Sequence, residues 1–194
     1  KPAAAVVVAT LRALKLHGGG GAVKAGSPLP IGLTGPNQEA LAKGFANLEQ
    51  HIANVKAHGV PVVVAVNAFI DDPVAELEWV RERSREVGAA DAAVSTHWAD
   101  GGKGAEALAT AVVRATAKPS VFRHLYDVDW PIKKKIQTIA MQIYGASVVS
   151  FDAQAEQDIE IAQQLGFDRL PICMAKTPLS LSHDPALKGR PSGF

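Results

Sequence analysis

The chain has 194 residues, of which 47% are hydrophobic and 20% are charged, values that are ordinary for a globular domain. Its formal net charge of +1 gives no electrostatic reason to expect a nucleic-acid or membrane-surface partner. The longest apolar run, residues 60–66, is far too short to span a bilayer, and the single cysteine excludes an internal disulfide, so a reducing, cytoplasmic setting is expected.

The first elements predict a buried strand followed, after a long connection, by a helix. Residues 3–10 are a continuous run of small apolar side chains, typical of a strand buried on both faces. A basic and apolar stretch, residues 11–16, leads into a loop rich in Gly and Pro over residues 17–36, and loops of this length are usually functional or mobile. Residues 37–58 predict a helix. Its apolar stripe consists of Leu41, Phe45, Leu48, Ile52 and Val55.

The same alternation continues through the next sixty residues. Residues 61–66 predict a second buried strand, and Asp72 is expected to cap a helix that ends at Gly88. The inner face of that helix is expected to carry Val74, Leu77, Val80 and Val87. Residues 91–95 predict a third strand, residues 97–104 a loop and residues 105–117 a helix. Strands that alternate with helices in this way predict an α/β fold with a parallel sheet and flanking helices.

The character of the sequence changes at Pro119, so a boundary is expected between residues 1–118, a large α/β region, and residues 119–194, a smaller α/β subdomain. The subdomain is expected to hold helices at residues 132–143 and 152–165, the second capped by Asp152. Short strands are expected at residues 148–151 and 171–175.

Both ends of the chain predict an internal piece of a longer, multidomain protein. The chain begins at Lys1 rather than at Met and enters a strand almost at once. It ends at Phe194 after a tail rich in Gly and Pro, without a closing helix or strand.

The ends of the predicted strands are the places where chemistry is expected, because ligands of open α/β sheets bind at the carboxyl ends of the strands. Phe69 follows the second strand and Trp98 follows the third, so neighbouring strands would bring both rings to one edge. Two such rings hold a flat heteroaromatic ligand by stacking, each contributing ~1 kcal/mol beyond burial. The alternative is that Phe69 and Trp98 only cover the sheet edge.

Asn67, His97 and Arg12 are further candidates for lining this edge. Asn67 follows a strand as a polar residue does in the base-recognition loop of P-loop NTPases, although Asn also caps βα loops for purely structural reasons. His97 lies beside Trp98, and Arg12 is able to meet a phosphate or carboxylate or to lie in solvent. The six histidines show no metal-ligand spacing, so no metal site is predicted. Cys173 is expected to be a buried, inert thiol.

The sequence lacks the loop with which P-loop NTPases cradle phosphate, G-x-x-x-x-G-K-[ST]. Residues 101–104 resemble it superficially, but no Ser or Thr follows Lys103 and the first Gly is not at the required spacing. A flexible turn is the favoured interpretation of this segment, and an anion site at the start of the next helix is the alternative. No catalytic residue is predicted in this chain.

A series of motifs, in order over nearly the whole chain, resembles the formate–tetrahydrofolate ligase family (10-formyltetrahydrofolate synthetase). These motifs lie at residues 1–19, 44–52, 59–69, 97–104, 125–129, 143–146, 170–177 and 189–191. The resemblance implies an ATP-dependent ligase of one-carbon metabolism. Formate attacks the γ-phosphate to give formyl phosphate, and N10 of tetrahydrofolate then takes the formyl group. It also implies a three-layer, P-loop NTPase-like fold whose ATP site lies in a part not present here.

The resemblance gives roles to the two rings. Phe69 matches the family's aromatic residue after the V-N-x-F strand and Trp98 matches the Trp of the W-A-x-G-G loop, which together sandwich the pterin. The resemblance also implies Mg-ATP and a monovalent cation, both held mainly outside this chain, and a homotetramer. Two departures are visible: Ile70 stands where relatives have Pro, and the loop at residues 17–36 is longer and richer in Gly.

Without the phosphate loop, the chain alone is expected to be catalytically silent. Two alternative functions stay open at this point. One is a non-enzymatic P-loop-like scaffold that serves assembly or regulation. The other is a different nucleotide-binding protein of the SIMIBI type, which would need Asn67 to recognise a base.

Overall fold

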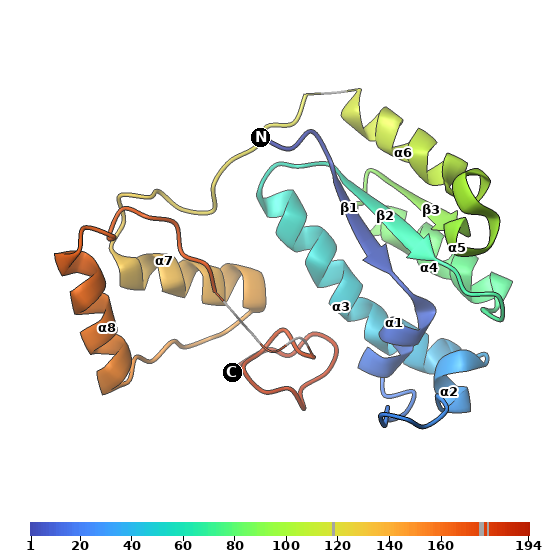
Figure 1. Ribbon diagram of the computed structural model, residues 1–194, viewed down its shortest axis with the longest axis horizontal. Coiled ribbons are helices and arrows are strands. Elements are labelled where there is room, and N and C mark those ends of the chain that lie inside the picture. Colours follow the sequence, from blue (N-terminus) through green and yellow to red (C-terminus); the bar gives the residue numbers. More distant parts are fainter. Residues whose placement is uncertain (118, 175–176, 178) are drawn as a thin grey trace. The chain divides into compact units, whose positions relative to one another are not determined.

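The structure, a computed structural model, describes residues 1–117, 119–174, 177 and 179–194 (Figure 1). The chain forms two compact units. The first comprises Lys1–Arg123 and Lys188–Arg190, and the second comprises His124–Leu187 and Pro191–Phe194. The expected boundary between residues 118 and 119 adjoins residue 118, which lies outside the described residues, and it stays a prediction.

The first unit is built on a three-stranded parallel sheet in the order β1-β2-β3, with β1 (Ala5–Ala9), β2 (Val62–Asn67) and β3 (Asp91–Ser95). The register pairs Val7 with Val64 and Val64 with Ala92. The three strands lie where the apolar runs predicted them, and the parallel α/β architecture with flanking helices is confirmed. All three strands run the same way, so their carboxyl ends meet at one edge (Figure 1).

Helices connect and cover the strands of the first unit. They are α1 (Leu11–His17), α2 (Ile31–Thr34), α3 (Gln38–Ala57), α4 (Val74–Glu86), α5 (His97–Asp100), a 3-10 turn (Gly101–Ala105) and α6 (Glu106–Thr116). The loop expected at residues 97–104 is therefore helical. Asn37 caps α3, its side-chain oxygen accepting from Ala40 N at 3.1 Å.

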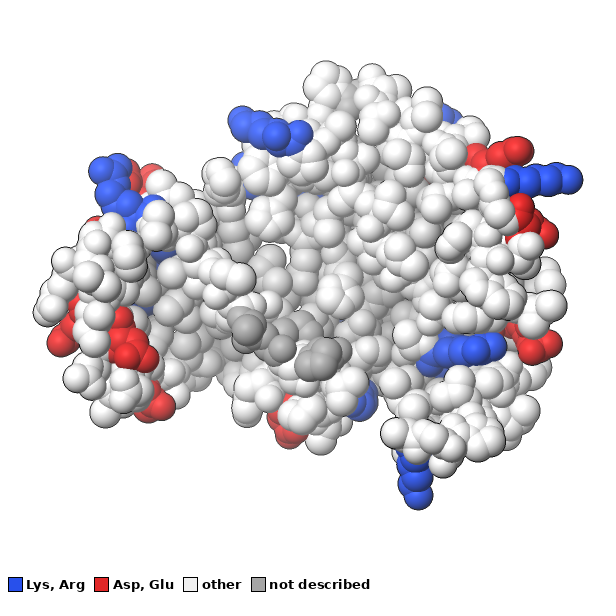
Figure 2. Space-filling view, in the orientation of Figure 1, with Lys and Arg blue, Asp and Glu red and all other residues white. Residues whose placement is uncertain are grey.

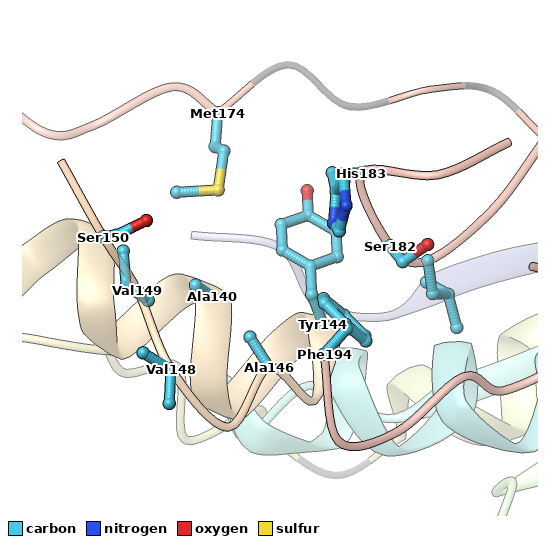
Figure 3. A pocket seen from close by; sticks show the side chains of 11 residues that line it. Ala140, Tyr144, Ala146, Val148, Val149, Ser150, Met174, Ser182, His183 and Phe194 are labelled. Carbon is cyan, nitrogen blue, oxygen red and sulfur yellow. The ribbon is translucent and has the colours of Figure 1, made fainter. Parts of the chain in front are cut away.

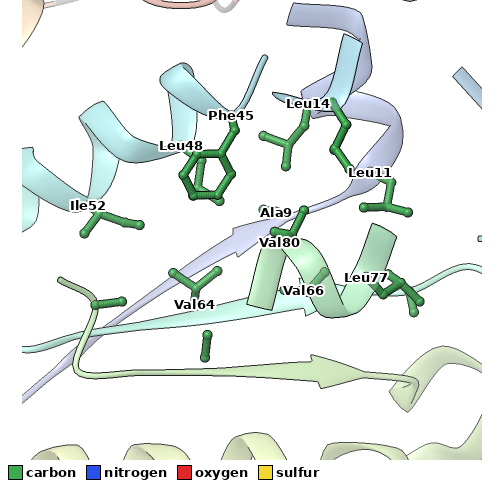
Figure 4. Close-up of a cluster of buried hydrophobic side chains, with 14 of the residues drawn as sticks. Ala9, Leu11, Leu14, Phe45, Leu48, Ile52, Val64, Val66, Leu77 and Val80 are labelled. Atoms are coloured by element: carbon green, nitrogen blue, oxygen red, sulfur yellow. The ribbon is translucent and has the colours of Figure 1, made fainter. Parts of the chain in front are cut away.

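The main core lies between one face of the sheet and helices α1, α3 and α4 (Figure 4). Alternate strand residues such as Val64 and Val66 face this core, and the predicted stripe of α3 packs onto them. The ring of Phe45 meets Trp79 of α4 edge-on at 5.4 Å between centroids. The buried residues of the core are Ala9, Leu11, Leu14, Leu41, Phe45, Leu48, Ile52, Val62, Val64, Val66, Ala68, Leu77, Val80, Ala89 and Ala92.

The other face of the sheet is covered only in part. Val63 and Ala93, which alternate with the core residues, are buried where α6 packs on β2 and β3. On β1 the expected burial on both faces was wrong, because the equivalent side chains, Val6 and Val8, are 45% and 64% exposed. This face of β1 and its outer edge thus have no covering element among the described residues.

Lys15 of α1 anchors the long connection between β1 and α3. Its Nζ donates to Gly35 O at 2.8 Å and lies 2.5 Å from Glu76 Oε2, while Glu76 Oε1 accepts from Asn37 N at 2.6 Å. Both charged side chains are almost fully buried. The second half of the connection, which includes α2, is therefore fixed to α1, α3 and α4. Most of residues 22–30, in the segment between α1 and α2, are exposed.

Among the described residues of the second unit, the regular elements are all helical. It contains α7 (Ile132–Ile139), a π-helical turn (Ala140–Tyr144) and α8 (Ala153–Gln164), and Asp152 caps α8 as predicted, accepting from Ala155 N at 2.7 Å. The strands expected at residues 148–151 and 171–175 were wrong: residues 148–151 and 171–174 are irregular, and residue 175 lies outside the described residues. A lone four-residue run has no neighbouring strand to satisfy its backbone groups.

Two side-chain expectations were also wrong. Val74 is 73% exposed rather than inward, because it opens α4 at the sheet edge before the helix reaches the core. Cys173 is exposed, since the strand expected to bury it did not form. Within the part of the chain that the structure describes, none of the helices combines the length and apolarity needed to cross a bilayer.

Candidate functional site

The carboxyl edge of the sheet brings the predicted site residues onto three neighbouring segments. Asn67 pairs in register with Ser95, so the segments that carry Phe69 and Trp98 leave the sheet side by side. At the end of β1, Thr10 caps α1 through a 3.2 Å bond from Ala13 N. This cap starts the helix at once and puts Arg12 in its first turn.

Phe69 and Arg12 are in direct contact. The guanidinium carbon of Arg12 lies 4.0 Å from the centroid of the Phe69 ring, a cation–π geometry that joins the ends of β1 and β2. The Phe69 side chain is half-buried. One ring face is thus occupied by the guanidinium, so Arg12 packs against the candidate site instead of extending freely into solvent.

Asp72 has a different role from the expected helix cap. The residue before α4 is Pro73, and no side chain caps this helix. Instead Asp72 Oδ2 accepts from Phe69 N at 3.0 Å, and Asp72 N donates to Phe69 O at 3.1 Å. The carboxylate therefore closes the turn that follows β2, and Asp72 joins the candidate site, where the sequence did not predict it. The signal that could have found it is an Asp three residues after Phe69, because a short carboxylate can accept from the backbone N–H three residues before it.

Asn67 ends β2 with its side chain half-buried. Its Oδ1 is buried and accepts no hydrogen bond from any described residue. A buried, unpaired acceptor is uncommon in folded proteins. At the carboxyl end of a central strand it is available to a donor group of a ligand.

His97 and Trp98 lie in α5, directly after β3. Trp98 is 70% exposed, and His97 is exposed with its Nδ1 3.3 Å from Ser95 Oγ. The segment is held by Thr96, whose Oγ1 donates to Asp100 Oδ2 at 2.7 Å and whose N–H donates to Gly104 O at 3.0 Å. A Cβ at Gly104 would lie 2.5 Å from the Thr96 backbone, so glycine is required for this closure.

The structure thus brings Phe69 and Arg12 together and puts Trp98 on the same edge. No ring contact joins Phe69 to Trp98 within the described residues. Ile70, the neighbour of Phe69, is 81% exposed and adds apolar surface to this edge. The edge is an aromatic and apolar surface with one cation, one buried carboxylate and one unpaired amide oxygen.

On the face that Figure 2 shows, charge does not single out another site of the first unit. On the face drawn in Figure 2, basic and acidic residues are interspersed over the described surface of the first unit, without a continuous field of either sign. Among the described residues no group of three or more His, Cys, Asp or Glu side chains is placed to hold a metal ion. No metal-binding role is therefore given to any described residue.

A cavity of about 540 Å³ lies within the second unit (Figure 3). Its lining is mainly apolar and includes the rings of Tyr144, His183 and Phe194, the last two 6.0 Å apart. Burial, and then the neighbouring Cys173, raise the pKa of Tyr144. The sequence did not predict this cavity, because its walls come from separate irregular segments that carry no periodic pattern.

Comparison with known proteins gives one consistent result. The family model described as formate–tetrahydrofolate ligase matches residues 1–194. The human cytoplasmic C-1-tetrahydrofolate synthase is 53% identical over 193 residues, covering 100% of this chain and 21% of the relative. A mitochondrial C-1-tetrahydrofolate synthase of Saccharomyces cerevisiae is 48% identical, with 20% of it covered. The formate–tetrahydrofolate ligase of Desulforamulus reducens is 49% identical, with 34% of it covered. The chain thus spans a fifth to a third of these relatives.

Proposed function

Because the chain belongs to the formate–tetrahydrofolate ligase family, we propose that it supplies the tetrahydrofolate-binding edge of an ATP-dependent ligase. In that reaction formate displaces ADP from the γ-phosphate to give formyl phosphate. N10 of tetrahydrofolate then attacks the formyl carbon, and phosphate leaves. The residues of this chain bind and orient the pterin, and no step of phosphate transfer is assigned to them.

The observation that carries the proposal is the position of two aromatic residues after neighbouring parallel strands. Phe69 is anchored by contacts within the protein, whereas Trp98 leaves most of its surface free. A flat ring between them would gain stacking and bury exposed apolar surface. Asn67 Oδ1, unpaired and buried, is suited to accept from a ring N–H group. His97 and Arg12 line the same edge.

Several further features belong to the same proposal. The fold is that of a P-loop-like, three-layer domain whose sheet continues beyond β1, which fits the exposed Val6 and Val8 and the uncovered edge. Magnesium-bound ATP and a monovalent cation are held mainly by other parts of the enzyme. The enzyme acts as a homotetramer in the cytoplasm, the compartment for which several relatives are named.

Titration calorimetry of the chain with tetrahydrofolate tests the ring site. Trp98→Ala is expected to weaken binding about tenfold, because one stacking partner worth ~1.4 kcal/mol is lost. Phe69→Ala is expected to have a similar effect. Trp130→Ala makes the same chemical change in the second unit, where Lys134 Nζ lies 3.5 Å from the ring centroid, and serves as the matched control. Equal effects of Trp98→Ala and Trp130→Ala would overturn the proposal.

A second experiment separates binding from catalysis. The chain lacks the phosphate-cradling motif, so it is expected to form no 10-formyltetrahydrofolate from formate, ATP and tetrahydrofolate. The product is measured by its conversion to 5,10-methenyltetrahydrofolate in acid, with a full-length ligase as the positive control. Turnover by this chain alone would show that phosphate transfer does not need residues outside it.

A further inference from the structure

Asp72 is a buried carboxylate whose two oxygens meet two different parts of the ring site. Its side chain is 1% exposed. Oδ2 accepts from the backbone N–H of Phe69 at 3.0 Å, and Oδ1 faces Arg12 Nε at 4.0 Å. Since the Arg12 guanidinium also lies on the Phe69 ring, the three residues form a closed set in which each contacts the other two.

The contact between Asp72 and Arg12 is incomplete. Asp72 Oδ1 and Arg12 Nε are both buried, and neither has a hydrogen-bond partner among the described residues. A charge-assisted hydrogen bond between such groups is ~2.8 Å long, so the guanidinium stands about 1 Å short of bonding. The Arg12 guanidinium thus lies over the Phe69 ring, although a small movement would let it form a hydrogen bond with the Asp72 carboxylate. An unpaired buried polar group is costly, so an arrangement that retains two of them needs a physical reason.

The two faces of the Phe69 ring have different surroundings. Arg12 occupies one face, so a ligand ring has only the other face on which to stack. The Asp72 carboxylate fixes the backbone of Phe69 through one oxygen and attracts the guanidinium through the other. Both the place and the tilt of the ring thus depend on a single side chain from the turn before α4.

We propose that Asp72 is a positioning residue of this site: it fixes the Phe69 backbone and holds Arg12 behind the ring, which presents the opposite face to the pterin. This inference rests on the proposed function. Asp72 does not touch the ligand, because its carboxylate is enclosed by protein. Its removal acts through Phe69 and Arg12.

Two substitutions separate the two contacts of the carboxylate. Asp72→Asn keeps an oxygen that accepts from the Phe69 N–H but loses the charge that attracts Arg12. Asp72→Ala loses both. Asp72→Asn is expected to weaken tetrahydrofolate binding about fivefold, the size of a cation–π contact, and Asp72→Ala more than that. Asp71→Asn, the same change at the exposed neighbouring residue, is expected to leave the affinity unchanged.

A double-mutant cycle with Arg12→Gln distinguishes positioning from general loss of structure. If Asp72 acts through Arg12, the variant with both Asp72→Asn and Arg12→Gln binds no more weakly than the weaker single variant. Arg12→Gln alone is expected to weaken binding about fivefold as well, since the same cation–π contact is lost. If the two residues acted independently, the two effects would multiply to about 25-fold. Amide hydrogen exchange of Phe69, measured without ligand, is expected to accelerate in Asp72→Ala and not in Asp72→Asn.

The outcomes separate failure of the inference from failure of the proposed function. No loss of affinity in Phe69→Ala or Trp98→Ala removes the ring site itself, and the inference with it. Loss of affinity in those variants, together with unchanged binding in Asp72→Asn and Asp72→Ala, overturns the inference alone. Multiplicative effects in the cycle also overturn it, because Asp72 then does not act through Arg12.

Discussion

At the scale of single residues, the Lys15–Glu76 pair is the ion pair whose disruption is expected to cost the most stability among those described. The two side chains are 0% and 6% exposed, and Lys15 Nζ lies 2.5 Å from Glu76 Oε2. Breaking a buried pair leaves an uncompensated charge, so Glu76→Gln is expected to lower the free energy of unfolding by ~3 kcal/mol. Urea denaturation of the chain measures it.

The control for this change is an exposed pair of the same residue types. Lys43 and Glu39 lie 2.6 Å apart with most of both side chains in solvent. Glu39→Gln is expected to leave the urea midpoint nearly unchanged, because solvent screens exposed pairs. Replacing both buried partners, with Lys15→Met and Glu76→Leu, is expected to restore only part of the loss, because Gly35 O and Asn37 N then lose their partners. Equal effects of Glu76→Gln and Glu39→Gln would contradict the account.

Asp91 predicts how stability responds to acid. Burial raises the pKa of Asp91, but the Ala92 N–H, Arg85 and Arg114 together lower it by more. The pKa in the folded protein therefore lies below the ordinary 3.8. A depressed folded pKa contributes stability that is fully present above the unfolded value and is lost as pH falls through the folded value. The loss is therefore expected below about pH 4.

The test compares thermal unfolding of the original chain and of Asp91→Asn between pH 6 and pH 2.5. The variant is expected to be less stable at pH 6, because the carboxylate no longer pairs with Arg85 at 2.9 Å. Its stability is expected to fall less steeply below pH 4, since this titrating group is gone. Parallel curves for both proteins over the whole range would show that Asp91 does not contribute to acid sensitivity.

At the scale of elements, helices α1 and α3 approach each other through two glycines. A Cβ at Gly44 would lie 1.7 Å from Leu14 O, and one at Gly18 would lie 1.7 Å from Ala40 O. Alanine normally stabilises a helix interior by ~1 kcal/mol relative to glycine. Here the clash with backbone outweighs that gain, and Gly44→Ala is expected to destabilise the chain by roughly 3 kcal/mol, as overpacking does.

Circular dichroism during thermal unfolding measures this effect, with Gly102→Ala as the control. Gly102 has no atom within 4 Å of the position that a Cβ would take. Its substitution is expected to change the midpoint little. A Gly44→Ala protein as stable as the Gly102→Ala protein would mean that the two helices can separate without cost.

The sequence predicted those elements whose own apolar pattern decides them. The stripe of α3 and the apolar runs of β1, β2 and β3 identified a helix and three strands to within a few residues. Helix α1 was missed because seven residues are too few to show a period. Asp72-Pro73 has the spacing of a helix cap, yet the same carboxylate closes the turn after Phe69. Local pattern alone does not decide which backbone N–H a short polar side chain will choose.

At the scale of the whole molecule, the parallel sheet and the edge that carries the candidate site followed from strand order. The contact of Arg12 with Phe69 did not follow, since it depends on how α1 starts after β1. The second unit was the least predictable. Its irregular segments are held by single long-range contacts, such as Lys135 Nζ to Leu170 O at 3.1 Å and Ile172 N to Tyr126 Oη at 2.8 Å, which leave no periodic signal.

The uncovered side of β1 predicts how the chain behaves at high concentration. An edge strand offers unpaired backbone groups to other chains, and Val6 and Val8 add exposed apolar surface beside them. The chain is therefore expected to self-associate as its concentration rises, as measured by sedimentation velocity. Val8→Lys is expected to reduce this association, because a charge on an edge strand opposes pairing. Val113→Lys, at an exposed position on α6, is the control, and an equal reduction by both changes would show that net charge rather than the β1 edge governs association.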